Sequence, residues 1–463
     1  MSRTQNPSRR TVLGGGLAGL TGLAGLAGCG SGPRAAGDIS FWGAGGDDLP
    51  AQTRFLDAWT AANPGTRITA SQVPAGSLNY GASIITAVRG GTAPDVWLLD
   101  RFTTAQYAAL GLLEPLDPLV EEHSGVSVEE FRSGWLRFAA DEASYDGKLY
   151  ALPTETDCRS LFYNKQLLRE AGVDPDELDP ANGPVTFDRV LEMADAVTRR
   201  DARGNYERIG WIPWSDEGWP MTYSFARGAK YFDDTSCSVD LLADPVLHAY
   251  EQLEEWRDRL DFTKVDLFLA TYQPASGPPS ANTMFTGRRA FVTATPWWLS
   301  QFAKYAPDLD VGVTHLPVNS PGDQPYTWSG GFAVATPKGS SRSKEVWDFM
   351  TSYAGADGQR TLLGELKRLP TRVDVLSDPS ASDPSLRFFA DELQHSTSRP
   401  PLPAAQVLWD ATVDAKDAVL YSRTPAREAL QRAQDRVEPQ MSPYCPFRLP
   451  EGFGTVGVQP AGT

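Results

Sequence analysis

The chain has 463 residues. Because a single hydrophobic core rarely accommodates a chain of this length, two lobes or domains are expected. Its apolar share of 41% and its charged share of 22% are ordinary for a globular protein. A formal charge of −16, without any run of basic residues, excludes nucleic acid as an expected partner because its phosphates would be repelled.

The N-terminus has the pattern of a bacterial export signal. The arginine pair Arg9-Arg10 precedes an uncharged, glycine-rich stretch, Thr11 to Gly28, which is too short for a membrane span and resembles a twin-arginine signal. The run LAGC ends at Cys29 and resembles a lipoprotein processing box, in which small residues admit the peptidase and the thiol accepts the lipid. We therefore expect a signal peptide over 1–28, lipidation of Cys29 and a flexible tether over 29–37. The general export route stays an alternative to the twin-arginine route, and either leaves the protein anchored on the outer face of the cytoplasmic membrane.

Strand and helix patterns alternate over the next sixty residues. Apolar runs at 38–42, 66–73 and 94–100 predict strands, and the stretches 49–65 and 83–94 predict helices. Strands that alternate with helices through short links indicate a parallel sheet covered by helices.

The same kinds of pattern return later in the chain. A helix is predicted over 186–199, with its first threonine as the cap, and another over 341–355. Apolar strands are predicted within 288–296, 309–317 and 330–337.

Two adjacent tryptophans, Trp297 and Trp298, follow Pro296 at the end of one predicted strand. On an extended segment neighbouring side chains point to opposite faces, so the two rings need two different surfaces. We expect one ring in a core and the other at a junction between cores or against a ligand.

Cysteine and histidine usage bears on disulfides and metals. If Cys29 is lipidated, Cys158, Cys237 and Cys445 remain, and outside the cytoplasm one disulfide and one leftover thiol are expected. Three pairings are possible and the sequence does not choose among them. The four histidines are scattered and the cysteines lie far apart, so neither a metal site nor another cofactor is expected.

Three motif blocks occur in a fixed order. The first runs from GKLYALPTETD through YNK, at 163–165, to TFD, at 186–188; the others are MFTGRRAFVTATPWW and VGVTHLPVNSPGDQPYTWSGGFAVATPKGSSRSKEVWDFM. Together they resemble the extracellular solute-binding proteins of ABC importers, in the branch that binds sugars and includes the maltose-binding proteins. The resemblance covers roughly residues 38–375 and extends to the lipoprotein start. Phe187 and Thr295 depart from the family pattern, and about ninety C-terminal residues match no motif of the family.

This resemblance implies an α/β architecture, the type 2 periplasmic-binding-protein fold, in which two α/β lobes are joined by crossing hinge segments around a ligand cleft. Carried over to this sequence, it places the first crossing near Pro153–Thr156 and the second near Thr295–Pro296. The expected division is an N-terminal lobe over 38–153 and 296–338, a C-terminal lobe over 154–295 and 339–449, and a tail over 450–463.

A sugar site needs flat rings for the apolar faces of the sugar and carboxylates, amides or arginines for its hydroxyl rim. Such mixtures stand in this sequence at expected strand ends and at the crossings, the edge where ligands of α/β folds bind. Directly after Pro296, Trp297 is the ring expected to face the ligand, with Trp298 in the core. The candidate ligand-binding residues are Asp47, Asp48, Asp100, Glu155, Trp214, Trp219, Trp297, Trp328, Ser329, Gly330 and Arg372.

The resemblance implies a monomeric binding lipoprotein, not an enzyme, that captures a di- or oligosaccharide by cleft closure. It would deliver the sugar to ABC permease subunits with an associated ATPase. One alternative is a secreted glycoside hydrolase with Asp100 and Glu155 as its carboxylate pair, but no local motif and no regular βα repeat supports it. A second alternative is a binding protein for another solute, such as a peptide or a polyamine.

Overall fold

The structure is a computed structural model that describes residues 38–72, 80–340, 343–378, 383–454 and 457. These residues fall within the unit Gly37–Thr463. The expected signal peptide, the lipidation site Cys29 and the tether lie outside the described residues. Within the described ranges, no helix combines the length and the apolar character that a membrane span requires.

The first of two main sheets has the strand order β2-β1-β3-β15-β6. Its three leading strands are parallel, as the alternation of strands and helices predicted, while β15 runs antiparallel to both β3 and β6. The strands are β1 (Asp38–Ala44), β2 (Arg67–Gln72), β3 (Val96–Asp100), β6 (Ala151–Pro153) and β15 (Phe332–Ala335).

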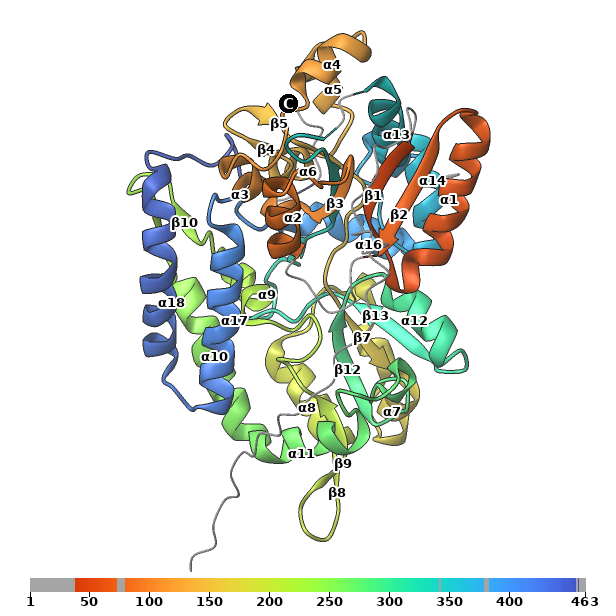
Figure 1. Cartoon of the computed structure of the whole chain (residues 1–463). Coiled ribbons are helices and arrows are strands. Elements are labelled where there is room, and N and C mark those ends of the chain that lie inside the picture. Colours follow the sequence, from red (N-terminus) through yellow and green to blue (C-terminus); the bar gives the residue numbers. More distant parts are fainter. Residues whose placement is uncertain (1–37, 73–79, 341–342, 379–382, 455–456, 458–463) are drawn as a thin grey trace, which may run out of the picture. The chain divides into compact units, whose positions relative to one another are not determined.

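Eight helices of the described chain pack with this sheet, and together they form what we call the first lobe (Figure 1). In α1, Phe55, Leu56 and Trp59 share the buried face, and Asn63 follows as the C-cap before a proline. The helices are α1 (Leu49–Ala62), α2 (Tyr80–Arg89), α3 (Thr104–Ala109), α4 (Asp117–His123), α5 (Val128–Arg132), α6 (Arg137–Glu142), α13 (Lys344–Ala354) and α14 (Ala356–Leu366).

The second main sheet has the strand order β13-β7-β12-β9-β8. Its central strand β12 is buried along its whole length, because it is paired on both edges and covered by helices. The strands are β7 (Ser160–Asn164), β8 (Arg199–Arg200), β9 (Tyr206–Trp211), β12 (Arg289–Ala294) and β13 (Val311–Thr314).

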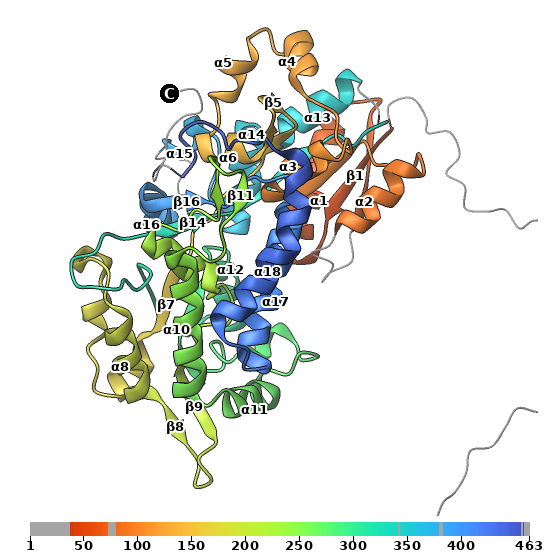
Figure 2. The ribbon, with the colours of Figure 1, turned by 90° about the vertical axis from the view of Figure 1, so that its left-hand side faces the viewer.

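This sheet and the helices packed on it form the second lobe. The predicted cap of α8 is confirmed, since the Thr186 side chain accepts a hydrogen bond from the Arg189 amide. Helices α10, α17 and α18 lie side by side in both views (Figures 1 and 2). The helices are α7 (Lys165–Glu170), α8 (Phe187–Val197), α9 (Pro220–Ser224), α10 (Asp244–Leu260), α11 (Phe262–Tyr272), α12 (Trp298–Tyr305), α17 (Ala405–Tyr421) and α18 (Ala426–Met441).

Short elements complete the architecture. The pairs are β4 (Ser144–Tyr145) with β5 (Lys148–Leu149), β10 (Phe232–Asp233) with β11 (Ser238–Val239), and β14 (Thr327–Ser329) with β16 (Ser396–Ser398). Two short helices, α15 (Val373–Leu376) and α16 (Arg387–Glu392), lie between α14 and β16.

The first crossing is where the sequence predicted it, because residues 154–159 connect β6 of the first sheet to β7 of the second. The expected second crossing at Thr295–Pro296 is wrong. After β12 the chain forms α12 and returns as β13 to the same sheet, pairing with β7, and it changes sheets only between β13 and β15. The expected lobe boundaries shift accordingly: residues 296–314 belong to the second lobe, and α13 and α14 belong to the first.

The two adjacent tryptophans begin a helix rather than continue a strand. Trp298 is the first residue of α12 and is buried against Phe285 and Phe302, with ring centroids 5.3 Å and 5.7 Å away, so its assignment to a core is confirmed. Trp297 is partly buried and packs against the same cluster. The expected extended segment, on which the two rings would point to opposite faces, is therefore absent at Trp297 and Trp298.

The disulfide joins Cys237 to Cys445, which selects one of the three possible pairings. Cys158 is buried and unbonded to another cysteine, and burial raises the pKa of its thiol well above the usual value. Its Sγ donates to the Phe389 carbonyl at 3.6 Å.

Candidate functional site

A buried arginine joins the crossing segments to the first sheet. Arg101, directly after β3, has no exposed side-chain surface; its Nε pairs with the Glu142 carboxylate at 3.0 Å. Its two terminal nitrogens donate to backbone carbonyls of the two crossings, those of Glu155 and of Gly330 (2.8 Å). Burial raises the pKa of Glu142 to about 7, against the opposing effect of Arg101. Because the Arg101 side chain is fully buried and each of its nitrogens has a partner, we assign it a structural role in the site rather than ligand contact.

The close approach at Arg101 requires glycine in the return crossing. Gly331 has φ of 137°, and a Cβ there would lie 2.3 Å from the Glu155 carbonyl and 2.4 Å from Arg101 Nη1. The amide of the preceding Gly330 donates to Asp157 at 2.7 Å. Gly330, a predicted ligand residue, therefore uses its backbone to connect the two crossings.

A second arginine pairs with the predicted residue Asp100. Arg399, directly after β16, donates to both Asp100 oxygens, at 2.6 Å and 3.1 Å. The Asp100 side chain is 40% exposed whereas that of Arg399 is 5% exposed, so the carboxylate keeps contact with solvent. The guanidinium carbon lies 4.3 Å from the Phe102 ring centroid and 5.4 Å from that of Trp409.

Trp328 is present in this cluster but offers no free ring. It is 2% exposed, the Arg159 guanidinium lies 3.3 Å from its ring centroid, and its indole N–H donates to Thr222 at 3.0 Å. The adjacent Ser329 is fully buried, and its hydroxyl is hydrogen-bonded to that of Ser396. The prediction that Trp328 and Ser329 present their side chains to a sugar does not fit this geometry, because both are already enclosed.

Arg159 carries two partly exposed carboxylates at the same crossing. Its Nη1 contacts Asp157 at 2.5 Å and its Nη2 contacts Glu217 at 3.3 Å. The exposed fractions of the two acidic side chains are 22% and 33%. Burial raises the pKa of Glu217, although Arg159 opposes that rise.

Two half-buried tryptophans from distant segments meet beside these charges. The ring centroids of Trp219 and Trp409 are 4.2 Å apart at an interplanar angle of 38°. Trp219 comes directly before α9 and Trp409 lies in the second turn of α17. Trp219 was predicted as a site residue, whereas Trp409 was missed because it falls in the C-terminal region without motifs.

A third arginine brings together two more predicted residues. Arg368 donates to both Glu155 oxygens at 2.6 Å and to Asp48 at 2.6 Å. Burial alone would lower the pKa of Arg368, but the Glu155 and Asp48 carboxylates more than offset it, so the pKa is raised. Burial raises the pKa of Glu155. The side chain of Asp47, predicted beside Asp48, is outside what the structure describes.

Two further predicted residues have other roles. Arg372 was chosen from RLPTR, but Arg368 of the same motif makes the contacts; Arg372 lies 4.7 Å from the Trp135 ring centroid and pairs with Asp374 at 3.0 Å. Trp214 is buried in the second lobe, 6.2 Å from the Phe262 ring centroid.

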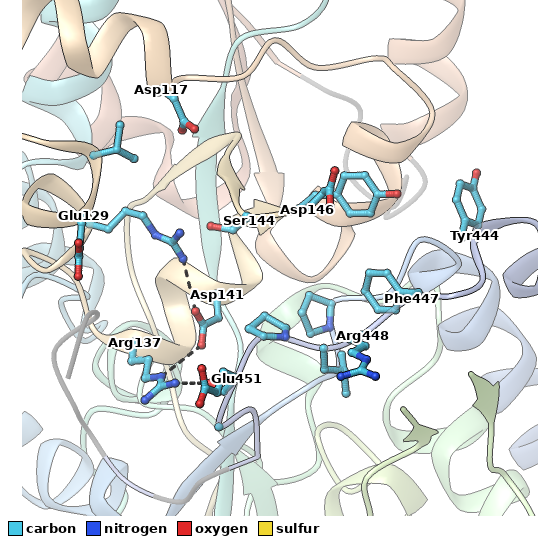
Figure 3. Close-up of a pocket in the computed structure, with 18 of the residues that line it drawn as sticks. Asp117, Glu129, Arg137, Asp141, Ser144, Asp146, Tyr444, Phe447, Arg448 and Glu451 are labelled. Atoms are coloured by element: carbon cyan, nitrogen blue, oxygen red, sulfur yellow. Dashed lines mark hydrogen bonds and ion pairs between the residues drawn. The ribbon is translucent and has the colours of Figure 1, made fainter. Parts of the chain in front are cut away.

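The sequence signal for the missed residues was partial. Asp157 stands in the stretch GKLYALPTETD quoted above and Glu217 lies two residues before the predicted Trp219, whereas Arg399 lies in the C-terminal region without motifs and only the fold brings it to Asp100. A cavity of about 1420 Å³ lies elsewhere, between the first lobe and residues 444–452 (Figure 3). Among the described residues, no group of three or more His, Cys, Asp or Glu could hold a metal ion.

Comparisons with known proteins identify a family and a shared fold. The family model described as bacterial extracellular solute-binding protein matches residues 46–360 of this chain. The maltotriose-binding protein of Pyrococcus abyssi (strain GE5 / Orsay) is 23% identical over 346 residues, covering 72% of this chain and 67% of its own. The arabinooligosaccharide-binding protein of Bacillus subtilis (strain 168) is 23% identical over 399 residues, covering 84% and 83%. Among solved structures, CpMnBP1 with mannotriose bound superposes with a TM-score of 0.74 at 23% identity, covering 87% of this chain and 100% of its own, so the fold is shared.

Proposed function

Because the chain belongs to the family of bacterial extracellular solute-binding proteins, we propose that it captures a di- or oligosaccharide where its crossing segments meet. The observation that carries this proposal is the Trp219–Trp409 pair beside partly exposed carboxylates that arginines hold in place. The names of the maltotriose-binding and arabinooligosaccharide-binding relatives support a carbohydrate.

The chemistry of the cluster matches the two kinds of surface on a sugar. The half-buried rings of Trp219 and Trp409 offer apolar area for the C–H faces. Asp100, Asp157 and Glu217 offer oxygens that accept hydrogen bonds from hydroxyl groups, and their arginine partners fix their direction. A rim that is already oriented costs little ordering entropy when the ligand binds.

The other predicted residues divide into two groups. Trp297, Asp48 and Glu155 remain proposed ligand contacts, since Trp297 is partly exposed and the two carboxylates are fixed by an arginine. The side chains of Trp328 and Ser329 and the backbone of Gly330 instead hold the crossings together, while Trp214 packs in the second lobe and Arg372 contacts Trp135.

Capture would be coupled to transport by hinge closure. The two lobes are linked through crossing segments at residues 154–159 and 327–331 and again by the chain between α14 and α17, where small backbone changes move whole lobes. The ligand would favour the closed form because that form makes additional contacts with it. The closed protein would dock as a monomer on a membrane permease with an associated ATPase, while a lipid at Cys29 keeps it at the outer face of the membrane.

A glycoside hydrolase is the less suitable interpretation. Its two carboxyl groups must face one glycosidic bond. Asp100 and Glu155, the pair considered from the sequence, bind two different arginines, Arg399 and Arg368.

A thermal-shift screen with mono- to tetrasaccharides, a polyamine and a short peptide tests the proposal. A ligand at a hundred times its Kd stabilises by about 2.7 kcal/mol, so an oligosaccharide should raise the melting temperature clearly. Chromatography of the same mixtures should show intact sugar. A shift with the peptide or polyamine alone, or sugar cleavage, would contradict the proposal.

The anchor and the transport partner have separate tests. Cys29→Ala should abolish incorporation of labelled lipid; normal labelling would contradict the lipid anchor. Liganded protein should stimulate the ATPase of the reconstituted permease more than ligand-free protein, and equal stimulation would contradict coupling through closure.

A further inference from the structure

The segment that follows α18, Ser442–Gly454, is bound to the second lobe. Cys445 forms the disulfide with Cys237 beside the β10–β11 hairpin. The Leu449 amide donates to the Asp234 carboxylate at 2.9 Å, and the Phe447 amide contacts Cys237 Sγ at 3.2 Å. Three consecutive attachments over five residues hold this part of the segment to the hairpin.

The same segment also contacts the first lobe. The Phe447 ring stacks on Tyr145 of β4, with centroids 6.3 Å apart and an interplanar angle of 13°. Its other neighbour is Phe232 of β10, at 5.8 Å and 70°. Arg137 of α6 donates to the backbone carbonyl of Glu451. Phe447 is thus shared between the two lobes, and the segment spans from one to the other.

Between its attachments the segment stands away from the first lobe. The cavity of about 1420 Å³ separates residues 444–452 from α5, α6 and the β4–β5 turn, and Figure 3 shows Phe447 and Glu451 on one side of it with Asp141 and Ser144 on the other. The Asp141 carboxylate in its wall lies 3.6 Å from Arg132 and 3.7 Å from Arg137. The connection between the lobes here therefore consists of a few localised contacts rather than a continuous interface.

We propose that Ser442–Gly454 is a strap: the disulfide holds it to the second lobe, and Phe447 and Glu451 attach it to the first, so that it restrains movement of the lobes relative to each other. A covalent attachment at one end keeps the strap close to its noncovalent contacts at the other, which strengthens them through effective concentration. Loss of either attachment should widen the range of lobe arrangements. This inference concerns the ligand-free protein and does not depend on the proposed sugar.

Electron spin resonance distances between the lobes test the strap. Spin labels at Asp57→Cys on α1 and Glu255→Cys on α10, in protein that also carries Cys29→Ser, report the distance, since both positions are exposed and Cys158 is buried. Phe447→Ala, with the disulfide intact, and the double variant Cys237→Ser with Cys445→Ser should both broaden the distance distribution. Tyr421→Ala, an exposed aromatic outside the strap, is the matched control and should leave it unchanged.

Hydrogen exchange of residues 446–451 shows whether each variant has released the strap. Faster exchange there together with an unchanged distance distribution would overturn the proposal. If the double cysteine variant does not fold, Phe447→Ala alone is the test, because it leaves the covalent attachment in place.

Discussion

Two regions of the protein combine aromatic rings with charged side chains, and they differ in how those charges are held. At the crossings, Arg399 contacts Asp100 at 2.6 Å and Arg159 contacts Asp157 at 2.5 Å. In the cavity under the strap, Asp141 lies 3.6 Å and 3.7 Å from its arginine neighbours. The distances between Asp141 and its arginines in the cavity are therefore longer than those of the ion pairs quoted for the crossings.

The two regions also draw on different parts of the chain. The crossing cluster combines the end of β3, both crossings and α17, so movement of either lobe changes it. The cavity is formed by neighbouring first-lobe elements and by the strap. We therefore base the proposed site on fixed charges and rings that both lobes contribute, rather than on cavity volume.

The largest expected effect concerns Arg101, which contacts Glu142 of α6 and both crossings. Replacing it, as in Arg101→Leu, leaves the Glu142 charge buried without its partner and frees two backbone carbonyls. We expect a loss of about 3–5 kcal/mol in the free energy of unfolding at pH 8. Urea denaturation measures it, with the exposed Arg189→Ala as the control, expected to lose less than about 1 kcal/mol. A loss as small as the control's would mean that the crossings do not depend on Arg101.

The next effect is the contribution of Glu142 to the pH dependence of the free energy of unfolding. Its pKa is about 7 in the folded protein against 4.5 normally, so the folded state binds more protons between these values. Its contribution therefore makes the protein less stable as pH rises from 4.5 to 7, by at most about 3 kcal/mol. Glu142→Gln should remove this part of the slope of unfolding free energy against pH. An identical slope in variant and wild type would contradict the assigned burial.

A smaller effect, on the affinity for the sugar, distinguishes the crossing cluster from the cavity. Trp409→Ala and Trp219→Ala each remove ring area from the proposed site, and we expect a loss of about 2 kcal/mol, roughly thirtyfold in Kd. Tyr444→Ala in the cavity wall should change Kd less than about twofold, since it lies outside that site. Calorimetric titration with the best sugar from the screen measures all three. The reverse ranking would move the site to the cavity.

The smallest effect lies away from both regions, at His315. Its Nδ1 contacts Glu392 at 2.7 Å; burial lowers the pKa of His315, but the Glu392 carboxylate more than offsets this, so the pKa is raised. The pair with Glu392 stabilises the folded protein fully at pH values below the pKa of His315 in the unfolded chain. This stabilisation is lost as the pH rises through the higher pKa of the folded state. His315→Gln should therefore reduce the change of melting temperature with pH over this range, while His248→Gln on the exposed face of α10 should not. Equal profiles for the two variants would contradict the pairing.

The local pattern of residues was sufficient to predict most of the sheets. The strands at 38–42 and 94–100 and the cap at Thr186 come from alternation and capping, which depend on near neighbours alone. The crossing at Thr295–Pro296 was carried over from the family resemblance and was misplaced, because α12 begins just after it and the chain then returns to the same sheet.

The candidate site was harder to predict because its contacts join residues far apart in the chain. Asp100 was predicted from a strand end and Glu155 from the first crossing, but their partners Arg399 and Arg368 are identified only by the fold. The burial of Trp328 could not be predicted because it depends on Arg159, a side chain from the other crossing. Which cysteines pair was likewise decided by the packing of α18 against β11.

Hydrogen–deuterium exchange with and without saturating oligosaccharide tests most directly where the sugar binds. We expect slower exchange in the segments around Trp219, in residues 327–331 and in the first turns of α17. We expect no added protection in residues 128–147 beyond what closure gives the rest of the first lobe. Protection confined to 128–147 and the strap, with unchanged exchange at the crossings, would contradict a sugar site at the crossings.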